Sequence, residues 1–288
     1  MPIHDQGYRR YGGGKTPHGQ AWTVIAKAGI RTMLGKRAFL GLLLLSWFPF
    51  VLRAIQIYAS ANFAQVAFLA PNAEMFHDFL EQQGFFVFVV TVYVGAGLVA
   101  NDRRANALQI YLSKPLTRTE YVFGKLAILM AFLLLVTWVP AIVLLIVQLL
   151  FAGNFTFLKN NLYLFPAITV YSFVEVITIA AAMLALSSLS KSARFVGILY
   201  TGLFFFTTAL WGVLTLALGA FHTRPGQGRP GVSWISLSAD LTQVGNAVFR
   251  LPLKYDSPVV VSFAVILLLV TVSGLVLERR VRGVEVVT

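Results

Sequence analysis

Gly14, Lys15 and Thr16 are the residues whose types and order most suggest chemistry, because they end the run GGGKT as a phosphate-binding loop ends. Such a loop also needs a glycine five positions before Gly14 and a buried strand ahead of it. The chain has Arg9 at that position and a polar tail before it. The spacing therefore predicts no nucleotide site in this segment.

Histidine and cysteine, which carry much hydrolytic and metal chemistry, give no useful pattern. The chain has no cysteine. Its four histidines are expected in tails or loops, and they are His4, His18, His77 and His222. Proteases that act inside membranes through a metal or a Ser/His pair need a histidine facing the interior of the helix bundle. We therefore expect no catalytic residue, no metal site and no cofactor bound by this chain.

The composition places the chain in a membrane, since 58% of its 288 residues are hydrophobic and only 12% are charged. Several runs of about 20 residues carry no charge, the length that spans a bilayer as a helix. The predicted fold class is an all-α polytopic membrane protein, with six transmembrane helices within residues 39–277. The expected spans are Phe39 to Tyr58, Gly84 to Ala100, Leu126 to Ala152, Leu162 to Leu189, Phe195 to Ala220 and Pro258 to Leu277.

Two ionisable side chains, Arg53 and Glu175, fall inside these spans away from their ends. A charge at mid-bilayer costs roughly 2.5 to 3.5 kcal/mol, so each is expected to face protein or water. Arg53 lies near an outer end, where snorkelling or a partly buried ion pair explains it. Glu175 lies deeper, and both a contact with substrate and a structural partner stay open for it.

The basic residues determine the expected orientation. Most of the 23 Lys and Arg lie before span one, between spans two and three, after span four and after span six. By the positive-inside rule both termini are therefore cytoplasmic. The connection before span two is acidic, with Glu74, Asp78 and Glu81, which agrees with an outer position. Anionic membrane lipids beside the basic segments explain the net charge of +12, so no nucleic-acid partner is expected.

The segments outside the spans have their own patterns. Residues 1–19 are expected to form a mobile cytoplasmic head, and residues 278–288 a cytoplasmic tail. Residues 20–38 predict an interfacial amphipathic helix, because their apolar and basic side chains fall largely on opposite faces. Residues 221–257 open with a Gly- and Pro-rich loop and then have apolar residues at helical spacing, which predicts a short helix on the outer membrane surface.

The connection between spans two and three, residues 101–125, is the most patterned polar segment. Asn101 to Leu112 predicts a short amphipathic helix on the cytoplasmic side, with its apolar residues on one face. Pro115 ends that helix, because it disfavours helical backbone in the residue before it. Thr117 and Glu120 then form a capping box, in which each side chain bonds to the other residue's backbone N–H. The predicted order is helix, sharp corner, helix.

In these residues the chain resembles the permeases of type-2 ABC exporters. Their usual pattern here is an acidic residue, then Gly-Thr-Leu-Glu-Leu-Leu-Leu-Ser, a basic residue, Pro-Leu-Ser-Arg, an acidic residue and a downstream Gly-Lys. In this chain Asp102 is followed, after three intervening residues, by the run NALQIYLSKPLTRTEYVFGK, in which Asn106 and Ala107 replace the Gly-Thr. The matching positions are Leu108, Ser113, Pro115, Leu116, Arg118, Glu120, Gly124 and Lys125.

The resemblance implies that this segment is a coupling helix, which docks in a groove of a separate ATP-binding cassette subunit. ATP and Mg²⁺ would bind to that subunit, and the permease itself would have no enzymatic activity. A second permease copy or a paralogue would complete the membrane unit, in the inner (cytoplasmic) membrane of a bacterium. The residues expected to dock are Asp102, Arg103, Arg104, Leu108, Tyr111, Leu112, Pro115 and Arg118.

Two functions of different class remain open at this point. One is a permease driven by a separate ATPase, exporting a lipid-like, peptide or drug-like substrate; the other is a self-sufficient secondary transporter or channel. An ion-coupled carrier normally has several intramembrane acids or matched broken helices. This chain has one such acid, Glu175, and no evident repeat, which favours the first function. A membrane enzyme or scaffold is the weakest alternative.

Overall fold

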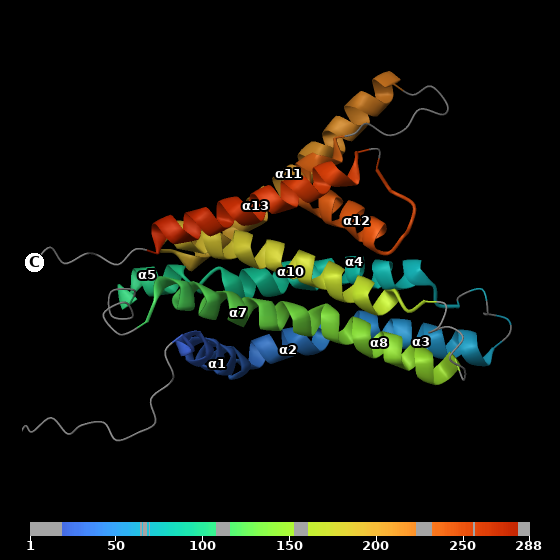
Figure 1. Ribbon diagram of the computed structural model, residues 1–288, viewed down its shortest axis with the longest axis horizontal. Helices are drawn as coiled ribbons and strands as arrows, with labels where there is room; N and C mark the ends of the chain where they lie inside the picture. Colours follow the sequence, from blue (N-terminus) through green and yellow to red (C-terminus); the bar gives the residue numbers. More distant parts are fainter. Residues whose placement is uncertain are drawn as a thin grey trace, which may run out of the picture.

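Figure 1 shows a computed structural model of the chain as an elongated bundle of helices. It describes residues 19–63, 65, 68, 70–107, 116–152, 161–222, 232–255 and 257–281. In these residues the regular structure is helical, and six helical segments are long and apolar enough to cross a membrane. These six segments are Arg37–Asn62, Ala73–Arg104, Arg118–Phe151, Leu164–Leu189, Ala193–Leu218 and Val259–Arg280. The prediction of six helical spans is therefore confirmed.

The helices of the described residues follow one another along the chain. In order they are α1 (Ala21–Leu34), α2 (Arg37–Ser46), α3 (Phe48–Asn62), α4 (Ala73–Val90), η2 (Thr91–Gly95), α5 (Ala100–Arg104), α7 (Arg118–Val136), α8 (Trp138–Ala152), α10 (Leu164–Leu189), α11 (Ala193–His222), η3 (Ser233–Ile235), α12 (Leu237–Val248) and α13 (Val259–Arg280).

Proline interrupts two of the spans. Trp47 separates α2 from α3, and Pro49 lies in the first turn of α3, where a missing N–H costs least. α7 gives way to α8 at Thr137, three residues before Pro140, which has no N–H to donate to the preceding turn. The Thr137 hydroxyl donates to the carbonyl of Leu133 at 3.0 Å. Each pair of helices still forms one apolar segment, as the sequence predicted.

The second span starts earlier than predicted. α4 begins at Ala73, and the side chain of Asn72 caps it by accepting from the Met75 N–H at 2.8 Å. The expected start at Gly84 was wrong because the first turns of this helix mix charged residues with a buried apolar face, so no uncharged run marks them. The residues that lie on this helix instead of in an acidic loop are Glu74, Asp78 and Glu81.

His77 also differs from its prediction. It lies on α4, is 2% exposed, and packs against the rings of Tyr171 and Phe249. The expectation that every histidine lies in a tail or loop was therefore wrong. His77 and two acidic residues of the same helix bring potential metal-ligand atoms within 4.8 Å of one another. Lys254 Nζ lies 3.6 Å from Glu81 Oε2, so a cation of the chain itself already faces this acidic group.

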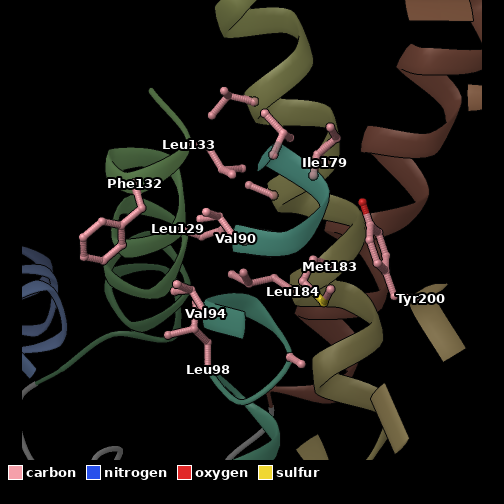
Figure 2. Packing of buried hydrophobic residues seen from close by; sticks show 14 of the residues in the cluster. Val90, Val94, Leu98, Leu129, Phe132, Leu133, Ile179, Met183, Leu184 and Tyr200 are labelled. Atoms are coloured by element: carbon pink, nitrogen blue, oxygen red, sulfur yellow. The ribbon is translucent and has the colours of Figure 1, made fainter. Parts of the chain in front are cut away.

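α10 is the central helix of the bundle, and it packs against α7, α8, α11, α12 and α13. Figure 2 shows Val94 of the second span, Leu129 of α7 and Met183 of α10 in one apolar cluster. A β-carbon at Gly95 would collide with the side chain of Met183. Glycine at this position is therefore what lets the second span approach α10 so closely.

The predicted short helix after span five is confirmed as α12, whereas its position at the outer membrane surface stays a prediction. It packs against α13, α10, α11 and α4, with more than half of its residues buried. Gln243 anchors it, because its Nε2 donates to the carbonyls of Tyr255 and Ser257, at 2.8 Å each. The Tyr255 N–H donates back to Gln243 Oε1 at 3.2 Å. Three hydrogen bonds that involve the buried Gln243 side chain thus hold the segment before α13 against α12.

Candidate functional site

The second span is broken before it reaches the polar connection. Its regular helix ends at Val90, a π-helical turn follows at η2, residues 96–99 form a turn, and α5 restarts at Ala100. Ser187 of α10 bonds to the broken backbone: its hydroxyl donates to the Ala96 carbonyl at 2.9 Å and accepts from the N–H groups of Val99 and Ala100 at 3.1 and 3.0 Å. Since buried backbone groups need partners, Ser187 stabilises this break.

Two neighbouring charges on α5 bind it to the helices on either side. Asp102 accepts from the Tyr121 hydroxyl at 2.7 Å and forms an ion pair with Lys125, whose Nζ lies 2.7 Å from Asp102 Oδ2. The two side chains of this pair are only 17% and 13% exposed. Arg103 donates to the carbonyl of Ser188, near the end of α10. Asp102 therefore holds α5 to α7, and Arg103 holds α5 to α10.

α5 ends sooner than the sequence predicted. Its last residue is Arg104, and Asn106 has a φ of 53°, in the left-handed region. The backbone at Ala107 is helical again, so the helix expected over 101–112 is interrupted at its second turn. Asn106 stands where the related pattern has glycine, and asparagine enters the left-handed region more readily than most other residues. Asn106 can thus end a helix in the way that glycine commonly does.

The predicted capping box is present at the start of α7. The Glu120 N–H donates to Thr117 Oγ1 at 3.2 Å, and the Thr117 N–H donates to Glu120 Oε2 at 2.9 Å. The other carboxylate oxygen, Oε1, accepts from the N–H of Ala21 at 3.1 Å. Ala21 is the first residue of α1, so one carboxylate holds the N-termini of two helices. A negative charge is stabilising at both, because helix N-termini carry partial positive charge.

α1 lies along α7 in close contact, and glycine permits the approach at two points. A β-carbon at Gly29 would collide with Ile128, and one at Gly124 would come within 2.8 Å of Ile25. The predicted amphipathic helix over 20–38 is thus confirmed as a helix, although it ends at Leu34. Its position at a membrane interface stays a prediction.

A large cavity lies beside Asp102, Tyr121 and Lys125. Its volume is about 1320 Å³, and its walls are α1, the segment from η2 to α5, the start of α7 and the start of α11. The charged residues in its lining are Lys36, Asp102, Lys125 and Arg194. One cavity is therefore lined by the broken span, by the ion pair between α5 and α7, and by the first turns of α7 and α11.

The predicted docking residues fall into three groups. Asp102 and Arg103 make the contacts described above, whereas Arg104 and Arg118 are exposed. The rest lie outside the described residues, and these are Leu108, Tyr111, Leu112 and Pro115. Sequence reasoning missed Ser187, because a serine in a serine-rich helix end gives no signal of a partner 88 residues away.

Glu175 and Arg53, singled out in the spans, do not pair with each other. Glu175 is 4% exposed on α10 and faces the interior of the bundle. Arg53 Nη1 donates to Gln56 Oε1 on its own helix at 3.0 Å and is only partly buried. The prediction that Glu175 lies inside the bundle is confirmed, while a contact of Glu175 with substrate stays a prediction.

Comparison with known proteins shows the family of the chain. A family model described as ABC-2 family transporter protein matches residues 23–280, which is most of the chain. No curated protein matches the chain. The match includes the six membrane helices, the connection between the second and third, and α12. The chain therefore belongs to the ABC-2 transporter family, as an integral, multi-pass transmembrane permease.

Proposed function

We propose that this permease is the membrane subunit of an exporter, driven by a separate ATP-binding cassette subunit that docks on residues 101–125. The observation that supports this most is how firmly both ends of that segment are attached. At one end Asp102 and Arg103 bind α7 and α10, and at the other end the capping box starts α7. A force applied to the segment would be transmitted to two membrane helices, α7 and α10, with little flexible loop between the segment and those helices.

The docking surface would consist of Leu108, Tyr111 and Leu112 at its centre, with Arg104 and Arg118 at its rim. Buried apolar side chains at an interface centre can each contribute about 2 kcal/mol, or roughly thirtyfold in affinity. Rim charges mainly affect the association rate and its salt dependence. ATP and Mg²⁺ would bind to the partner, and this chain would contribute no group to hydrolysis.

The membrane unit would contain two permeases, as two copies of this chain or as this chain with a paralogue. α11 supports this, because it is the span that the rest of the described chain covers least. A second permease on α11 would cover exposed apolar residues such as Phe206 and Leu216. The cargo we propose is lipid-like, peptide or drug-like, since the spans are apolar, and the location is the inner membrane of a bacterium.

The direct test is purification of the permease with its ATPase after Leu108 and Tyr111 are both changed to Asp. We expect the ATPase to be lost while the permease stays folded in the membrane. Arg104→Gln is the matched control, and it should reduce association by less than threefold, as expected of a rim charge. Full stoichiometry with coupled ATP hydrolysis in the double variant would refute the docking assignment. Transport by the purified permease alone would favour the secondary transporter instead.

A further inference from the structure

We propose that the cavity between α1 and α11 binds an anionic phospholipid. The headgroup would lie between Lys36 and Arg194, and the acyl chains would lie along the apolar walls. We call this cavity, of about 1320 Å³, the lipid groove; its walls are those described above. The proposal goes beyond the proposed function, because it does not depend on which cargo is carried or which ATPase docks. It does require that the second permease proposed on α11 leave the start of that helix uncovered.

The charge of the groove is positive. Of its four charged side chains, Asp102 and Lys125 neutralise each other in the 2.7 Å ion pair. Lys36 and Arg194 are exposed, and neither forms an ion pair with a carboxylate of the described residues. The ammonium of Lys36 lies 5.7 Å from the ring centroid of Tyr93, which also lines the groove. Two cations without a carboxylate partner favour an anionic ligand.

The two cations of the groove lie at the ends of membrane-spanning helices. Lys36 directly precedes the first span, which begins at Arg37, and Arg194 is the second residue of the fifth span. The second span ends at Arg104, just beyond the wall that carries Asp102. Charged residues at the ends of apolar spans lie at the boundary between hydrocarbon and headgroups.

The remaining lining is suited to hydrocarbon chains. Ile25 and Met33 come from α1, Ile128 from α7 and Ile198 from α11. Sites for drug-sized molecules usually have volumes of roughly 300 to 1,000 Å³, and the groove is larger. A small soluble anion would leave this apolar surface unused, whereas a phospholipid matches both the basic end and the apolar walls. This combination is why we assign the groove to a lipid rather than to free phosphate.

The test compares two double variants that remove the same charge. Lys36→Gln with Arg194→Gln removes the cations of the groove; Lys27→Gln with Arg31→Gln removes two exposed cations of α1 that do not line it. Binding of fluorescent phosphatidylglycerol to the full-length permease in detergent is measured by energy transfer from tryptophan. We expect about thirtyfold weaker binding for the groove variant, from two basic contacts near a membrane surface. We expect less than about a threefold loss for the control, since its cations are outside the groove.

Two further measurements separate the lipid from other occupants. A β-carbon at Gly202, in the groove wall, has no neighbour within 4 Å, so Gly202→Phe should weaken phosphatidylglycerol binding by filling the groove without a change in charge. Inorganic phosphate should not displace the lipid, and phosphatidylcholine should bind weakly to every variant. Equal losses in the two double variants, or displacement by phosphate alone, would overturn the proposal. Cross-linking of two Gly202→Cys copies that excludes lipid would assign the groove to a second copy of the chain, and would overturn it too.

Discussion

Ser187 and Ser188 offer a matched pair of substitutions that tests how the second span is stabilised. Both side chains are fully buried on α10, and they are adjacent in sequence. The Ser187 hydroxyl makes three bonds to the backbone of the broken span, whereas the Ser188 hydroxyl donates only to the Ala185 carbonyl of its own helix, at 2.7 Å. We predict that Ser187→Ala destabilises the permease far more than Ser188→Ala.

The size of the difference follows from the groups left without partners. Ser187→Ala leaves the N–H groups of Val99 and Ala100 and one carbonyl unpaired, and each unpaired buried group costs about 1 to 3 kcal/mol. Because the turn can relax and α5 can partly rewind, we expect a total of about 2 to 5 kcal/mol. Ser188→Ala leaves no N–H unpaired, so we expect less than about 1 kcal/mol.

The measurement is reversible unfolding of each variant in mixed micelles, followed by tryptophan fluorescence, with hydrogen exchange over residues 91–107 as the local readout. Ser187→Ala should lower the free energy of unfolding and speed exchange at Val99 and Ala100. Its effect on exchange in α12 should be small, because α12 and α5 lie towards opposite ends of the bundle (Figure 1). If the two serine variants unfold with the same free energy, the reasoning that Ser187 stabilises the broken span is refuted.

Three other predictions concern different contacts. Glu120→Ala should speed hydrogen exchange at the start of α1, because the Ala21 N–H loses its acceptor, whereas Thr119→Ala, at an exposed position, should leave that exchange unchanged. Asp102→Asn and Lys125→Met should show a coupling of roughly 1 to 2 kcal/mol in a double-mutant cycle of unfolding free energies; simple additivity would mean that the ion pair contributes nothing. Burial raises the pKa of Asp240 to about 6, although the neighbouring Ser262 hydroxyl opposes this shift. The folded protein therefore binds this proton more tightly than the unfolded chain, and its stability should fall as the pH rises from about 4 to about 6. Asp240→Asn should remove that slope and raise stability at neutral pH, and an unchanged pH profile in the variant would contradict this.

The sequence predicted the fold well where a local signal exists. Uncharged runs marked the six spans, the spacing of Thr117 and Glu120 marked the capping box, and helical periodicity marked α12. It failed where the outcome depends on distant partners. The start of α4 was misplaced because its first turns carry charged residues beside a buried apolar face, and no proline marks the break after Val90.

The candidate site could be predicted only in part. Asp102 and Lys125 were picked out by the family pattern, but their ion pair was not, because the sequence does not say which side of α5 faces α7. The link from Glu120 to Ala21 joins residues that are 99 positions apart. Such contacts are determined by packing, and the sequence gives no local signal of them.

The break in the second span also has a mechanical consequence. α5 is joined to α4 through a π-helical turn and four turn residues, so the regular i→i−4 hydrogen bonding that makes an α-helix stiff is interrupted between them. What holds α5 instead is a set of side-chain contacts, from Asp102 to α7 and from Arg103 to α10. A load applied to α5 would therefore pass first to α7 and α10, and only then to the rest of its own span. Glu120 also joins α7 to α1, so we predict that the ATPase of the proposed function would move α1 and α7 together, with the break acting as the hinge.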